Sequence, residues 1–336
     1  MNHVAVDLGS KQSHVCERQP NGTVTRSVRV KNSALPQLFE QLEPSRVVLE
    51  ACSEAFTVAR WAMEHRHEVV VVPSTLAPAL GVGARGVKTD KRDAENLSIA
   101  SCRMPRLPAV HVPSDFATQL RQQLAARALL VQMRTRVTNH LRCFVRQGVL
   151  ALKSGEAETT AKRVREALLA TPAGIPLHVE QLAQTHESVC LQIRAADAEL
   201  AQVVANDAVC KRLMTVPGVG PVTAAVFRAA VDEAQRFDGP HPLQSYLGLT
   251  PRESSSGQTE RRGGISKAGP RMVRAALVQA AWSAWRNAPN DPMVVWAKQL
   301  ATRRPKQVAI VALSRKLAGV LFALWRDESE YSPQHS

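Results

Sequence analysis

Two acidic residues three positions apart, Asp90 and Asp93, mark the stretch of this chain that could do chemistry. The residues from Asp93 onward favour a helix, and positions i and i+3 of a helix lie on one face. Basic residues around the pair, among them Lys88 and Arg92, would attract phosphate. Taken alone, acids at this spacing are more often a solvated helix face than a site. The remaining chain decides between the two interpretations.

Two further acids end short apolar runs that we expect to be buried strands. Asp7 closes the run that begins at His3, and Glu50 closes the run that begins at Arg46. Singly, Asp7 could be a turn-forming acid and Glu50 an acid at a helix start. Together with Asp90 and Asp93 they would converge at one edge of a sheet. Such hard oxygen ligands suit Mg²⁺, which can activate the attacking oxygen and stabilise the leaving one in phosphoryl transfer.

The segment 216–222 predicts a tight turn between two helices. Pro217, Gly218 and Gly220 give it the pattern of a helix-hairpin-helix, whose glycines let backbone amides approach a phosphate without reading sequence. A purely structural turn is the alternative.

Three adjacent serines, Ser254, Ser255 and Ser256, precede a glycine within a basic region. The cations of this region are Arg252, Arg261, Arg262, Lys267, Arg271 and Arg274. A serine hydroxyl needs an activating base or metal to act as a nucleophile, and the nearest histidine is His241. A polar serine-rich loop is the alternative. We expect a loop over 263–269 and Pro270 as the first residue of the next helix.

The N-terminal third has the pattern of an α/β domain with a mixed sheet. We expect strands over 3–8, 23–30, 46–50 and 68–72, with the second pairing antiparallel to the first, and helices over 37–42 and 55–65.

Long helical patterns fill the middle of the chain. We expect helices over 115–149, 157–170 and 177–204, in which the two long ones could form an antiparallel coiled coil that serves dimerisation, or a plain helical subdomain. The predicted fold class is α/β plus α. An N-terminal domain over 1–104 precedes a helical region over 114–206 and a mainly helical C-terminal domain over 207–330, closed by an amphipathic helix over 305–325.

Composition points to a polyanionic partner. The 336 residues carry a formal net charge of +14, with a pI of about 10.1, and nucleic acid is the first candidate. Only 4% of residues are aromatic, so we expect phosphate contacts to outweigh base stacking. No apolar run approaches the ~20 residues of a membrane span. The six scattered cysteines indicate free thiols in a reducing cytoplasm.

The motifs together resemble a known family. Asp7 on a first strand, the V-V-L-E ending in Glu50, and K-T-D-x-x-D-A over 88–94 are similar to the DEDD recombinases of insertion sequences, a family of transposases and DNA invertases. The segments G-L-T-P-R, S-G and I-S-K-A-G resemble their C-terminal serine transposase domain. The likeness covers about residues 3–100 and 210–285. It departs from the family at 51–56, where a Thr-Gly-Tyr-like run is usual.

The resemblance implies an RNase H-like N-terminal domain of the Holliday-junction-resolvase type. It also implies that Ser256 attacks a DNA phosphodiester to give a covalent phosphoserine, with Mg²⁺ on Asp7, Glu50, Asp90 and Asp93. The implied partners are the element ends, the target DNA and a non-coding guide (bridge) RNA. The implied assembly is a homo-oligomer, a dimer or tetramer with a site composed across protomers, in the bacterial cytoplasm at the nucleoid. The alternatives are a hydrolytic junction nuclease and a non-catalytic DNA-binding protein.

Overall fold

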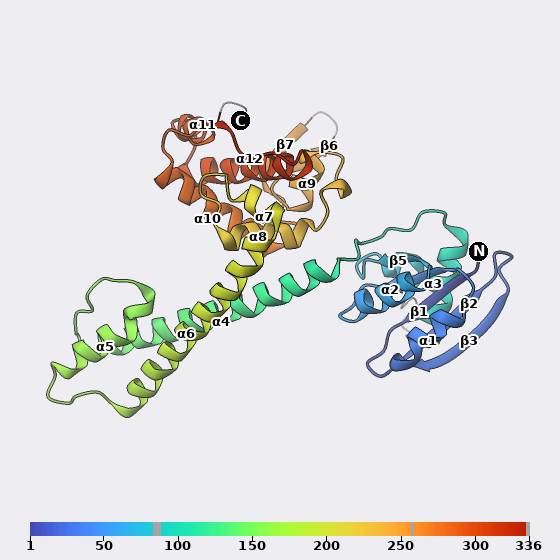
Figure 1. The fold of residues 1–336 in the computed structure, drawn as a ribbon, viewed down its shortest axis with the longest axis horizontal. Helices are drawn as coiled ribbons and strands as arrows, with labels where there is room; N and C mark the ends of the chain where they lie inside the picture. Colours follow the sequence, from blue (N-terminus) through green and yellow to red (C-terminus); the bar gives the residue numbers. More distant parts are fainter. Residues whose placement is uncertain (83–88, 257–258, 334–336) are drawn as a thin grey trace. The chain divides into compact units, whose positions relative to one another are not determined.

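The chain folds into two compact units, Met1–Pro113 and Ser114–Ser336. A computed structural model describes residues 1–82, 89–256 and 259–333, without the side chains of 253–262 (Figure 1). Each unit has its own hydrophobic core.

The N-terminal unit is built on a five-stranded sheet of order β3-β2-β1-β4-β5. The strands are β1 (His3–Asp7), β2 (Gln12–Arg18), β3 (Val24–Lys31), β4 (Arg46–Glu50) and β5 (Glu68–Val72). The pairs β1–β4 and β4–β5 are parallel, while β1–β2 and β2–β3 are antiparallel. The expectation of an α/β unit with a mixed sheet is confirmed.

One expected strand pairing is wrong, because β2 lies between β1 and β3. The sequence of β2 hides it, since polar Ser13 and His14 are buried on a strand that looks solvated. Ser13 Oγ donates to Asn32 Oδ1 at 2.7 Å, and His14 Nε2 lies 3.0 Å from Ser27 Oγ. Hydrogen bonds of this kind offset the cost of burying polar groups.

Helices cover both faces of the sheet. On one face α1 (Leu35–Gln41) and α2 (Ala55–Glu64) pack on alternate strand residues such as Val6 and Leu49. On the other face Ala5 and Val48 pack with Leu97 of α3 (Asp90–Arg103). The short 3-10 turns are η1 (Asn32–Ala34) and η2 (Ala77–Leu80). Because side chains alternate along a strand, every second residue of β1 and β4 faces α3.

Two long helices open the C-terminal unit and pair antiparallel. They are α4 (Asp115–Gln147) and α6 (Leu177–Asn206), joined through η4 (Ala157–Thr159) and α5 (Thr160–Leu169). Gln123 Nε2 donates to Glu199 Oε1 at 2.9 Å, and further along His186 Nε2 lies 3.0 Å from Thr138 Oγ1. The three expected helices are confirmed, with ends that differ by a few residues, and the long two pair within the chain.

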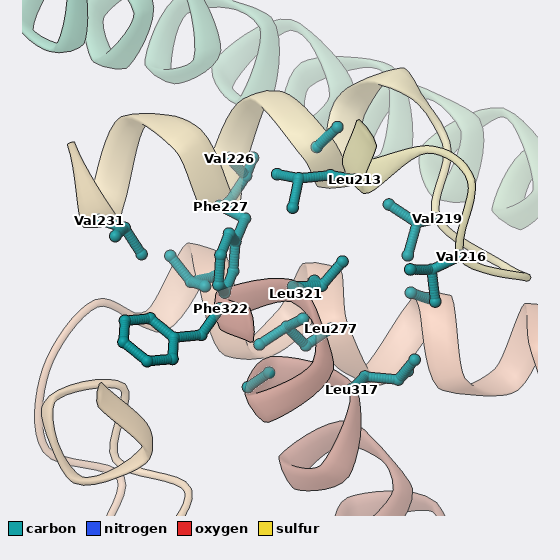
Figure 2. Packing of buried hydrophobic residues seen from close by; sticks show 14 of the residues in the cluster. Leu213, Val216, Val219, Val226, Phe227, Val231, Leu277, Leu317, Leu321 and Phe322 are labelled. Atoms are coloured by element: carbon teal, nitrogen blue, oxygen red, sulfur yellow. The ribbon is translucent and has the colours of Figure 1, made fainter. Parts of the chain in front are cut away.

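The rest of this unit is a helical cluster around one core. Its elements are α7 (Ala208–Leu213), α8 (Pro221–Val231), η5 (Ala234–Arg236), α9 (Pro240–Tyr246), α10 (Arg271–Asn287), α11 (Pro292–Ala301) and α12 (Lys306–Arg326). Figure 2 shows Phe227 of α8 against Leu277 of α10 and Leu321 and Phe322 of α12. All four side chains are fully buried, so these helices hold one another in place.

A two-stranded hairpin interrupts the helices. It consists of β6 (Pro251–Ser256) and β7 (Thr259–Ile265). The expected loop over 263–269 is therefore wrong in its first part, and Pro270 is the residue before α10 instead of its first residue. Glycine, serine and arginine carry no alternating apolar pattern, so the sequence gives no strand signal here.

The last helix corrects the expectation about apolar runs. Among the described helices, α12 is the one with the length and composition of a membrane span. Its Leu313, Leu317 and Leu321 are buried in the core of the C-terminal unit. This is the packing of a core helix.

Candidate functional site

The two strand-end acids occupy neighbouring positions on the sheet. Ala5 of β1 pairs with Val48 of β4 in parallel register, and Asp7 and Glu50 each follow two residues later. Since Ala5 and Val48 face α3, Asp7 and Glu50 lie on that same face, at the carboxyl ends of adjacent strands. Two of the four acids that the sequence predicts to converge, Asp7 and Glu50, thus lie next to each other at one edge of the sheet.

The other two acids lie in the first turn of α3. Thr89 caps this helix, because its hydroxyl accepts a hydrogen bond from the amide of Arg92 at 3.4 Å. Asp93 is 1% exposed, whereas Asp90 is exposed. The helix is fixed over β1 and β2 through its serines, with His3 Nδ1 2.8 Å from Ser101 Oγ. Asp93 therefore lies on the buried side of α3, toward the sheet.

Asp90 has an ion-pair partner on the outer strand. Arg29 of β3 places Nη2 3.6 Å from Asp90 Oδ2, and both side chains are more than half exposed. Nζ of Lys91, the next residue, lies 4.0 Å from Oε1 of Glu95, one helical turn later. Surface pairs of this kind contribute little to stability, so Asp90 can exchange its partner at low cost.

His14 is a neighbour of the acids that sequence reasoning missed. It pairs with Asp7 on one side and with Arg29 on the other, so the three residues form a row across β1, β2 and β3. Burial lowers the pKa of His14, and the positive charge of Arg29 lowers it further, which favours the neutral ring. No motif marks this histidine, and only the unrecognised strand β2 could have revealed it.

The acids share a face without forming a closed cluster. Among the side chains that the structure describes, no three of His, Cys, Asp or Glu come close enough together to hold a metal ion. The chemistry of Asp7, Glu50 and Asp93, three carboxylates on one side of the sheet, nevertheless suits a hard divalent cation. The four-carboxylate metal site stays a prediction. Lys88 lies outside the described residues.

The turn between α7 and α8 contains the predicted glycines. Gly218 has φ +86°, and a methyl group there would lie 2.7 Å from the amide nitrogen of Ala284 and closer still to the carbonyl oxygen of Ala280. Val216 and Val219 are buried beside it (Figure 2). At Gly220, just before α8, a methyl group would meet nothing within 4 Å. Gly218 therefore serves the packing of the turn on α10, whereas the backbone at Gly220 is open.

The three serines lie on β6, toward the tip of the hairpin. Ser256 pairs with Thr259 across the tip, and Pro251 pairs with Ile265 at the foot. The structure describes the backbone of Ser256, but the side chains of Ser254, Ser255, Ser256, Arg261 and Arg262 lie outside the described set. The backbone of these serines thus lies in the half of β6 nearer the tip of the hairpin.

The foot of the hairpin is tightly built. A methyl group at Gly248 would lie 2.7 Å from the amide nitrogen of Ala268, and one at Gly269 would collide with Tyr246. Arg274 Nη1 donates to the carbonyl oxygens of Ala268 and Gly269, each at 2.9 Å. It also donates to Leu247 O at 3.1 Å. Arg274 thus has a structural role that its residue type does not reveal.

A cavity of about 420 Å³ lies at this foot, against α12. Its lining residues include Leu249, Pro251, Ile265, Lys267, Gln307, Val308, Val311 and Arg315. Lys267 has a left-handed backbone with φ +57°. Arg252 donates to Ser266 O at 3.2 Å, and Arg271 is exposed at the start of α10.

Comparisons with known proteins find transposases along both units of the chain. A family model described as "Transposase", for the DEDD transposases of IS110 type, matches residues 4–149, and the model "Transposase IS116/IS110/IS902 family" matches residues 210–292. The "Probable family 20 transposase" of Pseudomonas aeruginosa is 31% identical, with 99% of each chain covered. The transposase for insertion sequence element IS1328 of Yersinia enterocolitica is 26% identical, with 98% of each chain covered. The transposase for IS1111A of Coxiella burnetii is 28% identical over 98% of this chain and 90% of its own length.

The family models and these relatives show that the chain, with its RNase H-like unit and mainly helical unit, is a DNA transposase. The chain belongs to the IS110/IS116 family of insertion-sequence transposases.

Proposed function

We propose that this transposase cuts and rejoins DNA through a covalent phosphoserine at Ser256, with a divalent metal, Mg²⁺, held by Asp7, Glu50, Asp90 and Asp93. The observation that carries the metal part is the shared register of Asp7 and Glu50 on the face that α3 covers. The serine part rests on the resemblance of the S-G segment to the family's C-terminal motif. The hairpin supports it, because an arm can bring a backbone-anchored hydroxyl to DNA.

The chemistry balances without an external energy source. The hydroxyl oxygen of Ser256 forms a bond to phosphorus, the bond from phosphorus to one deoxyribose oxygen breaks, and that sugar oxygen takes up the proton that the serine gives. The phosphoserine keeps the phosphodiester energy, so a hydroxyl from another strand can reverse the step and rejoin DNA. A bound Mg²⁺ would stabilise the negative charge that develops on the phosphoryl oxygens.

The carboxylates have separate tasks in this proposal. Asp7 and Glu50 at the strand ends and buried Asp93 on α3 would hold the ion, which would supply positive charge beside the phosphate. Asp90 leaves Arg29 to complete the set, and Arg29 is then available to a phosphate.

Cations and backbone amides would hold the nucleic acid. The proposed contacts are Lys88, Arg92, Pro217, Gly220, Arg252, Arg261, Arg262, Lys267 and Arg271. Gly218 and Arg274 would contribute by holding the turn and the foot of the hairpin in position. The open backbone at Gly220 supports a helix-hairpin-helix contact at the start of α8. We further propose a homo-oligomer that works at the bacterial nucleoid with a non-coding guide RNA.

Trapping of the adduct tests the serine. The protein, with RNA transcribed from DNA flanking its gene, is incubated with end-labelled element-junction DNA and Mg²⁺, then denatured. We expect a labelled band shifted by the mass of the protein that is lost in Ser256→Ala and without metal. Ser254→Ala and Ser255→Ala are matched controls that should keep the band.

Other outcomes would overturn the proposal. An adduct that survives Ser256→Ala but not Ser255→Ala would move the nucleophile by one residue. Free nicked DNA that persists in Ser256→Ala but vanishes in Asp93→Ala would identify a hydrolytic nuclease.

A further inference from the structure

Four of the five tryptophans lie on the last three helices of the chain, and two of them share one corner with lysines. Trp282 and Trp285 of α10 are partly exposed. The ammonium group of Lys306, the first residue of α12, lies 5.0 Å from the ring centre of Trp282 and 5.3 Å from that of Trp285. Lys298 of α11 lies 6.0 Å from the ring centre of Trp285.

Two exposed arginines, Arg303 and Arg304, occupy the turn that joins the helices bearing these lysines. We call this set the tryptophan–lysine corner, and it consists of Trp282, Trp285, Lys298, Arg303, Arg304 and Lys306. Its four cations all lie beyond residue 292, outside the segment that the family model covers.

The charge of the corner is not balanced locally. Asp291 is the one acidic residue between Arg271 and Arg326 in the sequence. It is engaged elsewhere, since it caps α11 and accepts a hydrogen bond from Tyr331 at 2.8 Å. In the described part of the chain, none of the four cations of the corner forms an ion pair. A surface of this kind attracts a polyanion.

We propose that the tryptophan–lysine corner binds single-stranded nucleic acid. The phosphates pair with the ammonium and guanidinium groups of the corner. When a lysine moves from an indole to a phosphate, an unpaired base stacks on the indole face that becomes free. Base stacking on aromatic side chains within a cationic groove is how proteins hold single strands without reading their sequence. A duplex offers the same phosphates but keeps its bases stacked on each other, so it can contact the cations of the corner but not the indole faces.

The position of the corner fits a strand that leads to the hairpin. Gln307 and Val308, which directly follow Lys306, line the cavity at the foot of β6 and β7. Pro251 and Ile265, the first and last residues of the hairpin that carries the serines, line the same cavity. A strand held at the corner could therefore continue past the foot of the hairpin. The proposal does not depend on the serine chemistry.

The test is binding of labelled oligonucleotides to the full chain. Fluorescence anisotropy of a 20-nucleotide oligothymidylate is measured over a series of salt concentrations, with oligouridylate, a duplex and an abasic strand of equal length beside it. In the charge variant, Lys298, Arg303, Arg304 and Lys306 are all replaced by glutamine. We expect it to lose about tenfold or more in affinity for the single strand and its salt slope to fall by about 2 to 3.

Three further variants separate stacking from charge and from folding. Trp285→Leu should weaken oligothymidylate binding about fivefold or more and leave abasic-strand binding unchanged, and Trp285→Phe should restore most of the loss. Arg326→Gln is the matched control at the other end of α12, where the cation is already paired with Asp327. It should change affinity less than twofold. The comparison of oligothymidylate with oligouridylate shows whether DNA or RNA is preferred.

The proposal is wrong if the charge variant binds oligothymidylate within twofold of the wild type. It is also wrong if the charge variant and Trp285→Leu weaken duplex and abasic-strand binding as much as single-strand binding, because the corner would then be a general electrostatic surface. Ser256→Ala should bind the oligonucleotide like the wild type, so failure of the phosphoserine proposal would be seen separately, in the trapping experiment.

Discussion

Gly218 should be replaceable only at a large cost in stability. Its φ of +86° is in the left-handed region, which costs a residue with a side chain about 1–2 kcal/mol. The added methyl group would also be forced against the backbone of Ala280 and Ala284 in the middle of α10, and overpacking of this kind costs about 1–3 kcal/mol. We expect Gly218→Ala to lower the free energy of unfolding of the C-terminal unit by about 2–4 kcal/mol.

Gly220 provides the matched control within the same turn. It has an extended backbone with φ −99°, and a methyl group there meets no atom within 4 Å. Gly220→Ala should therefore cost less than about 1 kcal/mol, the ordinary difference between glycine and alanine at the residue before a helix. If the turn holds a phosphate, Gly220→Ala should nevertheless weaken duplex DNA binding.

Urea unfolding followed by tryptophan fluorescence is the assay. Trp282, Trp285, Trp296 and Trp325 all lie in the C-terminal unit, so the signal reports mainly on that unit. With a denaturant slope of about 2–3 kcal/mol per molar urea, Gly218→Ala should lower the midpoint by about 1 M. A midpoint within about 0.2 M of the wild type would refute the close packing of this turn on α10.

Three other perturbations have defined outcomes. Asp93→Asn should leave the unfolding midpoint nearly unchanged and slow adduct formation about a hundredfold or more, measured by quantitative trapping, because a buried carboxylate that we propose as a metal ligand loses its charge. Ser114→Ala should cost about 2–3 kcal/mol in urea unfolding, because Ser114 caps α4 and donates to buried Asp232 at 2.6 Å. Burial lowers the pKa of His186, so the unfolded chain binds more protons than the folded one below the ordinary histidine pKa. Stability should therefore fall as the pH drops below about 6.5, and His186→Gln, followed by thermal melting between pH 7.5 and 5.5, should remove that part of the loss.

The sequence was most informative where the spacing of apolar residues that is typical of a strand or a helix continues along the whole element. The strands ending in Asp7 and Glu50 are short, apolar and followed by turn residues, so both their positions and their carboxylates could be predicted. The long helices α4, α6 and α12 were predictable for the same reason, since their patterns extend over many turns.

Features that depend on contacts with other segments, and not on a local sequence pattern, were not predicted. Strand β2 buries polar Ser13 and His14, whose hydrogen-bond partners Asn32 and Ser27 lie far along the chain. The tryptophan–lysine corner was also hidden, because a low aromatic content says nothing about whether the few indoles gather in one place. Such features depend on contacts between segments that no local window contains.

Two arginines in the basic region after the serines, Arg271 and Arg274, have different environments in the structure. Arg274 uses one nitrogen of its guanidinium for three carbonyl oxygens, including those of Leu247 and Ala268, and so fixes the foot of the hairpin. Arg271, one turn earlier on α10, is exposed and makes no side-chain hydrogen bond or ion pair within the described residues. A cation that already neutralises carbonyl dipoles has fewer donors left for a phosphate, whereas an open one keeps all five. Affinity for DNA should therefore depend on Arg271 through charge, and on Arg274 through the position in which it holds the serine-bearing arm.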